Sequence, residues 1–143
     1  MTLSEELLVG AFFAQIVWTM VVGFLTGRAR FGAAGAGRIK GDIALSDAGW
    51  PDDVRKVANN FNNQWETPTL FYALILMALH LKLASLFLAA MAFLYVASRV
   101  AHSYIHITSN VVVVRARIFF VGIGALIAMT AALIFTLLTG THL

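Results

Sequence analysis

The stretch Asn59-Asn-Phe-Asn-Asn-Gln-Trp-Glu-Thr-Pro-Thr-Leu-Phe71 decides the fold, because a polar, asparagine-rich segment here passes directly into a long apolar one. Glu66 stands at the junction. An ionisable side chain at membrane depth costs a few kcal/mol or more, so it normally faces a bundle interior or a polar cavity. On a helix, Asn62 and Asn63 would share the face of Glu66. The stretch therefore predicts a site at the entrance of a membrane helix.

The composition indicates an integral membrane protein. Of the 143 residues, 60% are hydrophobic and only 12% are charged, about half the charged fraction of soluble domains. The mean hydropathy is +0.84. The length accommodates one small bundle, so we expect a single domain over residues 1–143. The chain has no cysteine, which excludes disulfides, thiolate metal sites and a cysteine nucleophile.

Four apolar segments predict an all-α, integral membrane four-helix bundle. Each is close to the roughly 20 residues that a bilayer core of about 30 Å requires. Pro68 lies inside the second segment and predicts a kink there. The predicted helices cover residues 5–28, 53–81, 83–108 and 112–139.

The distribution of basic residues predicts the topology. Six of the ten lie between the first and second helices, and three more lie around the connection between the third and fourth. The positive-inside rule places these nine in the cytoplasm and both termini in the periplasm, if the membrane is the bacterial inner membrane that the compact loops favour. Membrane topology thus explains the basic pI, and no nucleic-acid partner is expected.

A polar constellation gathers at the predicted cytoplasmic face. Arg99, His102 and His106 follow one another at spacings of three and four, so they share one helical face. Arg115 precedes the fourth span, and Glu66 enters the second. Arginines clamp carboxylates and a glutamate takes an ammonium group, so this set suits a ligand that bears both. Alternatively, Glu66 pairs internally with Arg99 or Arg115 in a buried network.

Four short motifs resemble the MAPEG family, the membrane-associated proteins in eicosanoid and glutathione metabolism. They are Thr26-Gly-x-x-Arg30, Asn63-x-x-Glu66 with Pro68 behind it, Arg99-Val-Ala-His102, and Arg115. The resemblance covers nearly the whole chain, including the helix count and the long first loop. It implies a homotrimer in the membrane, with glutathione as cosubstrate bound between subunits near the cytoplasmic face.

The resemblance also implies roles for individual residues. Arg115 matches the arginine that holds the glutathione thiolate, so it is the candidate catalytic residue. The implied reaction is transferase or peroxidase chemistry, in which the thiolate attacks a lipophilic electrophile or a peroxide arriving from the lipid. No metal site is predicted. The candidate glutathione-binding residues are Arg30, Asn63, Glu66, Arg99, His102 and His106.

The chain departs from the prostaglandin-synthesising members of that family at several positions. Asn59 and Asn62 stand where those members have arginines that bind glutathione carboxylates, and His106 stands where they have a tyrosine. Ala116 and Phe119 replace a serine and a tyrosine near the thiol. These differences favour a general glutathione transferase or peroxidase over a specialised eicosanoid enzyme.

Other classes of function remain open at the level of sequence. Glu66, Arg99 and His102 would suit a proton or ion relay in a small transporter. A scaffold that keeps the fold without glutathione chemistry is a further alternative. Haem ligation by His80 with His102 or His106 is disfavoured, because His80 is predicted at the opposite side of the membrane from His102.

Overall fold

The computed structural model describes residues 1–44 and 46–141, and every regular element within them is helical. Three helices, the first and the last two, are long and apolar enough to cross a membrane. The chain is therefore an all-α integral membrane protein. Its elements are α1 (Leu3–Gly35), the 3-10 turn η1 (Asp47–Gly49), α2 (Asp52–Asn62), α3 (Thr67–His80), α4 (Leu86–Ile107) and α5 (Val112–Thr139).

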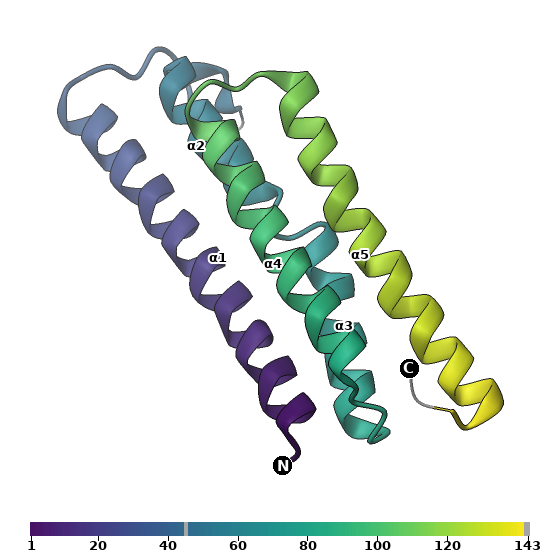
Figure 1. Cartoon of the computed structure of the whole chain (residues 1–143). Helices are drawn as coiled ribbons and strands as arrows, with labels where there is room; N and C mark the ends of the chain where they lie inside the picture. The colour runs from purple at the N-terminus through teal and green to yellow at the C-terminus, as the bar shows by residue number, and fades with distance from the viewer. Residues whose placement is uncertain (45, 142–143) are drawn as a thin grey trace.

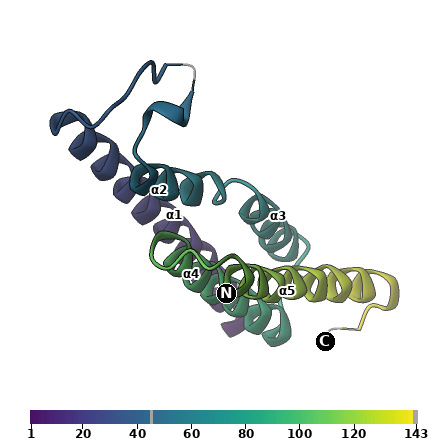
Figure 2. The same cartoon turned by 90° about the horizontal axis from the view of Figure 1, so that it is seen from above.

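The helices form a four-helix bundle in which α2 and α3 together make one broken rod. In Figure 1, α4 lies between α1 and α5, and α3 lies behind them. The view from above in Figure 2 shows α2 beside α1 and α3 continuing away from it. α4 contacts α1, α2 and α5, while α3 contacts both α1 and α5. This confirms the predicted fold class.

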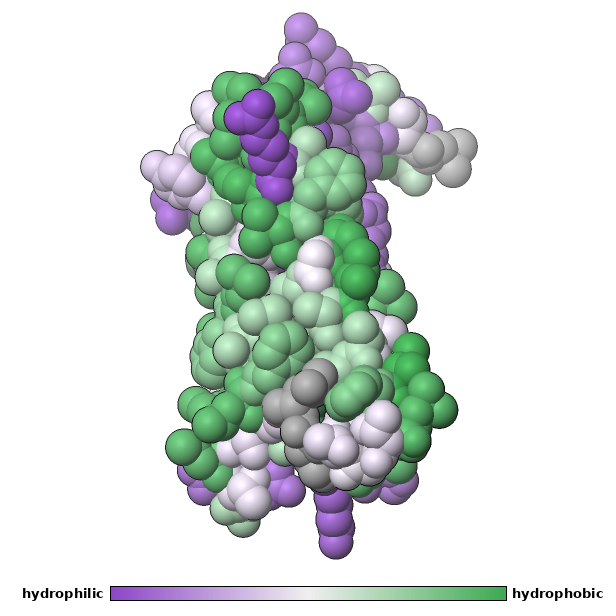
Figure 3. All heavy atoms as spheres, turned by 45° about the vertical axis from the view of Figure 1, so that its right-hand side comes forward, coloured by the Kyte–Doolittle hydropathy of each residue, from purple (hydrophilic) through white to green (hydrophobic). Residues whose placement is uncertain are grey.

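The two ends of the bundle differ in charge. The start of α1, the end of α5 and the turn between α3 and α4 lie at one end, and the loop after α1 and the α4–α5 connection lie at the other (Figure 1). Nine of the ten basic residues belong to the second end, which we call the basic end. In the space-filling view of Figure 3, apolar residues dominate the middle and hydrophilic ones gather at the two extremities. This banding is that of a protein spanning a bilayer.

α1 starts at a capping box and ends later than expected. The Thr2 hydroxyl accepts from the Glu5 amide at 3.3 Å, and a Glu5 carboxylate oxygen accepts from the Thr2 amide at 2.8 Å. The helix then runs to Gly35, seven residues past the predicted end at Arg28. One stripe of this helix is buried in the bundle: Leu8, Ala11, Gln15, Thr19, Val22, Thr26 and Ala33.

The segment 53–81, expected as one helix kinked at Pro68, is two helices. α2 ends at Asn62 and α3 starts at Thr67, with Pro68 in the first turn of α3. A proline has no N–H to donate to the carbonyl four residues back and its ring clashes with that carbonyl, whereas both problems vanish in a first helical turn. The expected kink is therefore a full break over residues 63–66. The last two helices lie close to their predicted ranges.

The apolar core joins α1, α3, α4 and α5. The rings of Phe71 and Tyr95 stack with centroids 4.6 Å apart. Gly122 lets α5 approach α4 closely, because a Cβ atom there would lie 2.5 Å from the Ser98 hydroxyl. Thr67 and Tyr95 also share a hydrogen bond of 2.9 Å, which ties the start of α3 to α4. The position of the α2–α3 break is thus fixed against the centre of the bundle.

Candidate functional site

A polar recess lies between the α2–α3 break, the end of α4 and the start of α5. It consists of two adjoining cavities of about 240 and 510 Å³. Both are lined by Asn63, Glu66 and Arg115; His102 lines the smaller, and Lys56 and His106 line the larger. The remaining lining residues are Asn59, Asn62 and Asn110 on the polar side and Val112, Ala116 and Phe119 on the apolar side.

Glu66 stands at the N-cap position of α3, with its side chain exposed in the single chain. Within the described part of the chain, this side chain makes no capping hydrogen bond. The carboxylate is therefore available to a ligand. Its backbone is held separately, because the Thr69 hydroxyl donates to the Glu66 carbonyl at 2.6 Å. Glu66 and Asn63 both line the two cavities, but they lie in the break between α2 and α3 and not on one helical face as expected.

Arg99 is buried beneath the recess, with 2% of its surface exposed. Its Nη2 atom donates to the Asn63 carbonyl at 2.8 Å. That carbonyl lies at the end of α2, where no further helical turn supplies an N–H. Arg99 thus caps the broken helix from α4. It was expected to bind ligand directly, but the structure places it behind the residues that line the two cavities.

His102 and His106 are buried on one face of α4, with ring centroids 6.0 Å apart. Nδ1 of His102 lies 3.2 Å from the Arg115 carbonyl. A carbonyl only accepts, so Nδ1 carries a proton, and a neutral ring then leaves Nε2 as an acceptor. Nε2 of His102 and Nδ1 of His106 are buried without a hydrogen-bond partner within residues 1–44 and 46–141. Each histidine thus has one ring nitrogen that is free to form a hydrogen bond with a ligand or a bound water.

Arg115 lies in the first turn of α5 and lines both cavities. Its Nη1 atom donates to Oδ1 of Asn110 at 2.7 Å. Asn110 adopts a left-handed backbone conformation with φ of 50°, which asparagine tolerates better than most residues. One bond therefore holds the guanidinium in place and leaves its other N–H groups for an anion. Arg115 and Glu66 bring opposite charges to the same recess.

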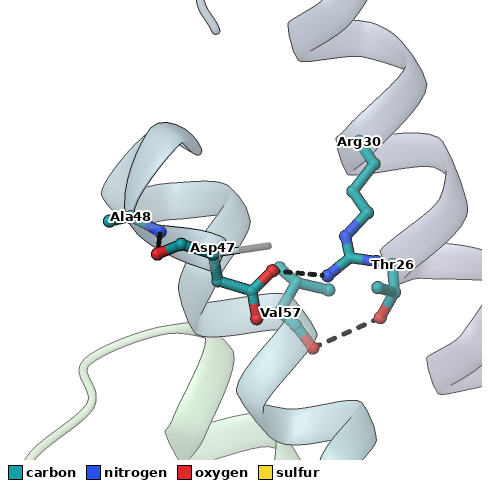
Figure 4. Close-up of polar contacts among 6 residues, drawn as sticks. Thr26, Arg30, Asp47, Ala48 and Val57 are labelled. Atoms are coloured by element: carbon teal, nitrogen blue, oxygen red, sulfur yellow. Dashed lines mark hydrogen bonds and ion pairs between the residues drawn. The ribbon is translucent and has the colours of Figure 1, made fainter. Parts of the chain in front are cut away.

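Arg30 lies apart from these residues within the chain. Figure 4 shows its guanidinium directed at Asp47, with Nη2 and Oδ1 3.0 Å apart. The guanidinium also lies 5.5 Å from the centre of the Trp50 ring. The long loop after α1 therefore engages Arg30. The structure does not bring it to Glu66, whereas Asn63, His102, His106 and Arg115 line the recess with Glu66.

Sequence reasoning missed a buried polar network beside the recess. Nε2 of Gln64 donates to the Ser103 hydroxyl at 3.2 Å, and Nε2 of Gln15 donates to Oε1 of Gln64 at 3.3 Å. Nε1 of Trp18 donates to the same hydroxyl at 3.3 Å. Gln15 was visible as a polar residue inside an apolar run, which is the signal that could have revealed it. The network joins α1 and α4 to the segment after α2.

The described residues do not form the metal-ion site or the haem ligand pair considered from the sequence. Within the residues that the structure describes, no three His, Asp or Glu side chains lie close enough together to hold a metal ion. His80 ends α3 at the end of the bundle opposite the recess, as the sequence predicted. It cannot share an axial ligand pair with His102.

Comparison with known proteins identifies the chain's family. The family model described as MAPEG family matches residues 8–135, which is 128 of the 143 residues. Searches of curated proteins and of solved structures found no significant match. The matched range includes α2, α3 and α4 entirely, together with every residue that lines the recess. The chain therefore belongs to the MAPEG family.

Proposed function

We propose that the protein is a membrane-embedded, glutathione-dependent transferase or peroxidase that acts on lipophilic electrophiles. The observation that carries this proposal is the recess that joins the Glu66 carboxylate and the Arg115 guanidinium at the end of the bundle. Family membership supports a broadly glutathione-related role. The larger cavity also falls within the range of about 300–1,000 Å³ typical of small-molecule sites.

The chemistry of the lining matches a peptide that bears two carboxylates, an ammonium group and amides. Glu66 would take the ammonium group, and Lys56 would pair with a carboxylate. The four asparagines of the recess offer donors and acceptors for peptide groups. Lys56 is notable because Asn59 and Asn62 lack the charge of the arginines found in prostaglandin-synthesising relatives. One lysine thus supplies a cation on the side where two arginines are missing.

Arg115 would hold the sulfur. A fixed positive charge next to a thiol stabilises the thiolate, which is the nucleophilic form. In the transferase reaction, the sulfur bonds to an electrophilic carbon while the leaving group departs with the bonding electrons. In the peroxidase reaction, the sulfur takes the terminal oxygen and the O–O bond breaks, so the remaining alkoxide leaves and is protonated to the alcohol. A second glutathione thiol then condenses with the sulfenic acid to give the disulfide and water. Val112 and Phe119 line the smaller cavity and offer apolar contact to such a substrate.

We further propose that the working unit is a homotrimer whose subunits share this site. The exposed apolar faces of α1 and α5 support subunit or lipid contact, since Phe13, Phe24 and Phe120 are each more than half exposed. Arg30, which is remote from Glu66 in its own chain, would then act through its own loop or on a neighbouring subunit. The basic end would face the cytoplasm and both termini the periplasm of a bacterial inner membrane.

Titration of the detergent-purified protein with glutathione tests the proposal. Calorimetry should show saturable binding, with ultraviolet thiolate absorbance rising in the same sample. Glu66→Gln should weaken binding while the oligomer stays intact in size-exclusion chromatography. Absence of binding at millimolar glutathione would refute glutathione chemistry and leave a transporter or scaffold role. Loss of the oligomer in Glu66→Gln, without a separate binding defect, would identify Glu66 as a structural residue instead.

A further inference from the structure

A separate cavity of about 410 Å³ lies beside the long loop that connects α1 to α2. Three basic side chains line it, those of Arg38, Lys40 and Arg55. Trp50 and Asp52 complete its polar and aromatic lining. We call it the loop cavity. It shares no lining residue with the polar recess.

The loop around this cavity is held in a defined shape. The Lys40 amide donates to the Gly49 carbonyl at 2.9 Å, which closes the loop on itself. Gly49 is required there, because a Cβ atom would lie 2.6 Å from the Lys40 carbonyl oxygen. The ion pair of Arg30 with Asp47 fastens the same loop to α1 (Figure 4). Arg38 and Lys40 are therefore presented from a loop that is tied back to the protein, and Arg55 from the first turn of α2.

The charges of the loop cavity leave a positive excess. Arg38 pairs with Asp53 at 3.2 Å, and Arg55 pairs with Asp52 at 3.4 Å. The hydrogen bond from Arg38 lowers the pKa of Asp53, so this acid is charged at neutral pH. Lys40 forms no ion pair with any residue that the structure describes. The three cations of the lining, counted with Asp52 in the lining and with Asp53, which pairs with Arg38 outside it, give a net charge of +1, which suits an anionic ligand.

The loop cavity lies beyond the apolar part of the helices, at the basic end. The Thr26 hydroxyl donates to the Val57 carbonyl at 3.2 Å, which places these two residues side by side (Figure 4). Asp52 starts α2 five residues earlier, or roughly 8 Å further along the helix axis at 1.5 Å per residue. The apolar run of α1 ends at Leu25. Interfacial layers extend about 5–8 Å beyond the hydrocarbon on each side, so the cavity borders this layer.

We propose that the loop cavity binds the headgroup of an anionic phospholipid. A phosphodiester carries a single negative charge, which balances the excess of the cavity. Lys40 and the free N–H groups of Arg38 and Arg55 would donate to its oxygens, as basic pockets do in lipid recognition. Trp50 would lie beside the glycerol region, where tryptophan is enriched in membrane proteins. This proposal is independent of glutathione chemistry.

Native mass spectrometry of the purified protein tests this assignment. We expect one phosphatidylglycerol molecule to bind per chain, with clear preference over phosphatidylcholine of the same acyl chains. Lys40→Gln and Arg55→Gln should each weaken phosphatidylglycerol binding about fivefold. Lys56→Gln is the matched control, because Lys56 adjoins Arg55 in sequence but lines the polar recess. Its affinity for phosphatidylglycerol should change less than about twofold.

Three results would overturn the assignment. If phosphatidylcholine bound as tightly as phosphatidylglycerol, the site would not distinguish lipids by the net charge of the headgroup. If Lys56→Gln weakened phosphatidylglycerol binding as much as Lys40→Gln and Arg55→Gln do, the basic end would attract anionic lipid in general and not through this cavity. Displacement of the lipid by sn-glycerol 3-phosphate at equal concentration would reassign the cavity to a soluble phosphate ester. Circular dichroism of each variant separates loss of binding from loss of fold.

Discussion

Nη2 of Arg99 on α4 donates a hydrogen bond of 2.8 Å to the main-chain carbonyl of Asn63, so a buried arginine completes a helix that belongs to another part of the chain. A main-chain carbonyl left unpaired away from water costs about as much as a lost hydrogen bond. The guanidinium removes that cost at the end of α2, immediately before the break. The break that carries Glu66 therefore depends on a residue 36 positions from Asn63.

Replacing this arginine by methionine should destabilise the bundle. Arg99→Met leaves the Asn63 carbonyl unpaired, and we expect a loss of about 1–3 kcal/mol in the free energy of unfolding. Thermal unfolding in detergent, followed by circular dichroism, measures it. Arg117→Met is the control, because Arg117 is exposed on α5 and should tolerate the change. Unchanged stability together with weaker glutathione binding would instead make Arg99 a ligand contact.

Arg115 is expected to favour ionisation of the glutathione thiol more than it strengthens binding of the whole peptide. Arg115→Ala removes the cation, so the pH midpoint of thiolate formation in bound glutathione should rise by about one to two units. The dissociation constant should change less, because Glu66 and Lys56 keep their contacts. A pH titration of thiolate absorbance at saturating glutathione measures the shift. Equal losses of thiolate and of binding would argue against this role.

Lys56 and Arg55 are adjacent but face different cavities, which allows a paired experiment. Lys56→Gln should weaken glutathione binding about tenfold, the scale of one charge-assisted hydrogen bond. Arg55→Gln should leave it within about twofold of the original value. Calorimetry on both variants gives the comparison. If the two variants behave alike, the polar recess does not recognise carboxylates through Lys56.

Asp53 should titrate below its ordinary range. The hydrogen bond from Arg38 is the largest cause of the lowered pKa, relative to a usual value of 3.8. A carboxyl whose pKa is lower in the folded state contributes stability above its unfolded pKa and loses it as the pH falls through the folded value. In Arg38→Gln, the midpoint should return toward 3.8. Carbon-detected magnetic resonance of the Asp53 carboxyl gives both midpoints, and identical midpoints would contradict the pairing.

Helix type and membrane character were predictable from apolar runs alone. The runs that became α1, α4 and α5 are long enough that no other element could satisfy their backbone in a bilayer. The predicted topology put Glu66, His102 and Arg115 at the same end of the bundle, and the structure places all three around one cavity. These features depend on local periodicity, which a sequence displays directly.

Features that depend on distant contacts were not predictable. A proline is compatible with a kink or with a full break, and the choice rests on whether another helix supplies a donor, which Arg99 does here. Arg30 was separated from the recess by the closure of its loop on Asp47 and Trp50. Arg55 and Lys56 line different cavities, and which cavity each one reaches follows from the packing of α2 against α1 and α4.

The shortness of α3 has a consequence for how two substrates of opposite solubility would meet. Its 14 residues cover about 21 Å, some 9 Å less than a hydrocarbon core of about 30 Å. The asparagines and Glu66, which precede α3, occupy the part of the membrane depth that α3 does not span. Water would therefore reach below the membrane surface along this side of the protein. A water-soluble thiol and an oil-soluble partner would then reach each other with neither leaving its own phase.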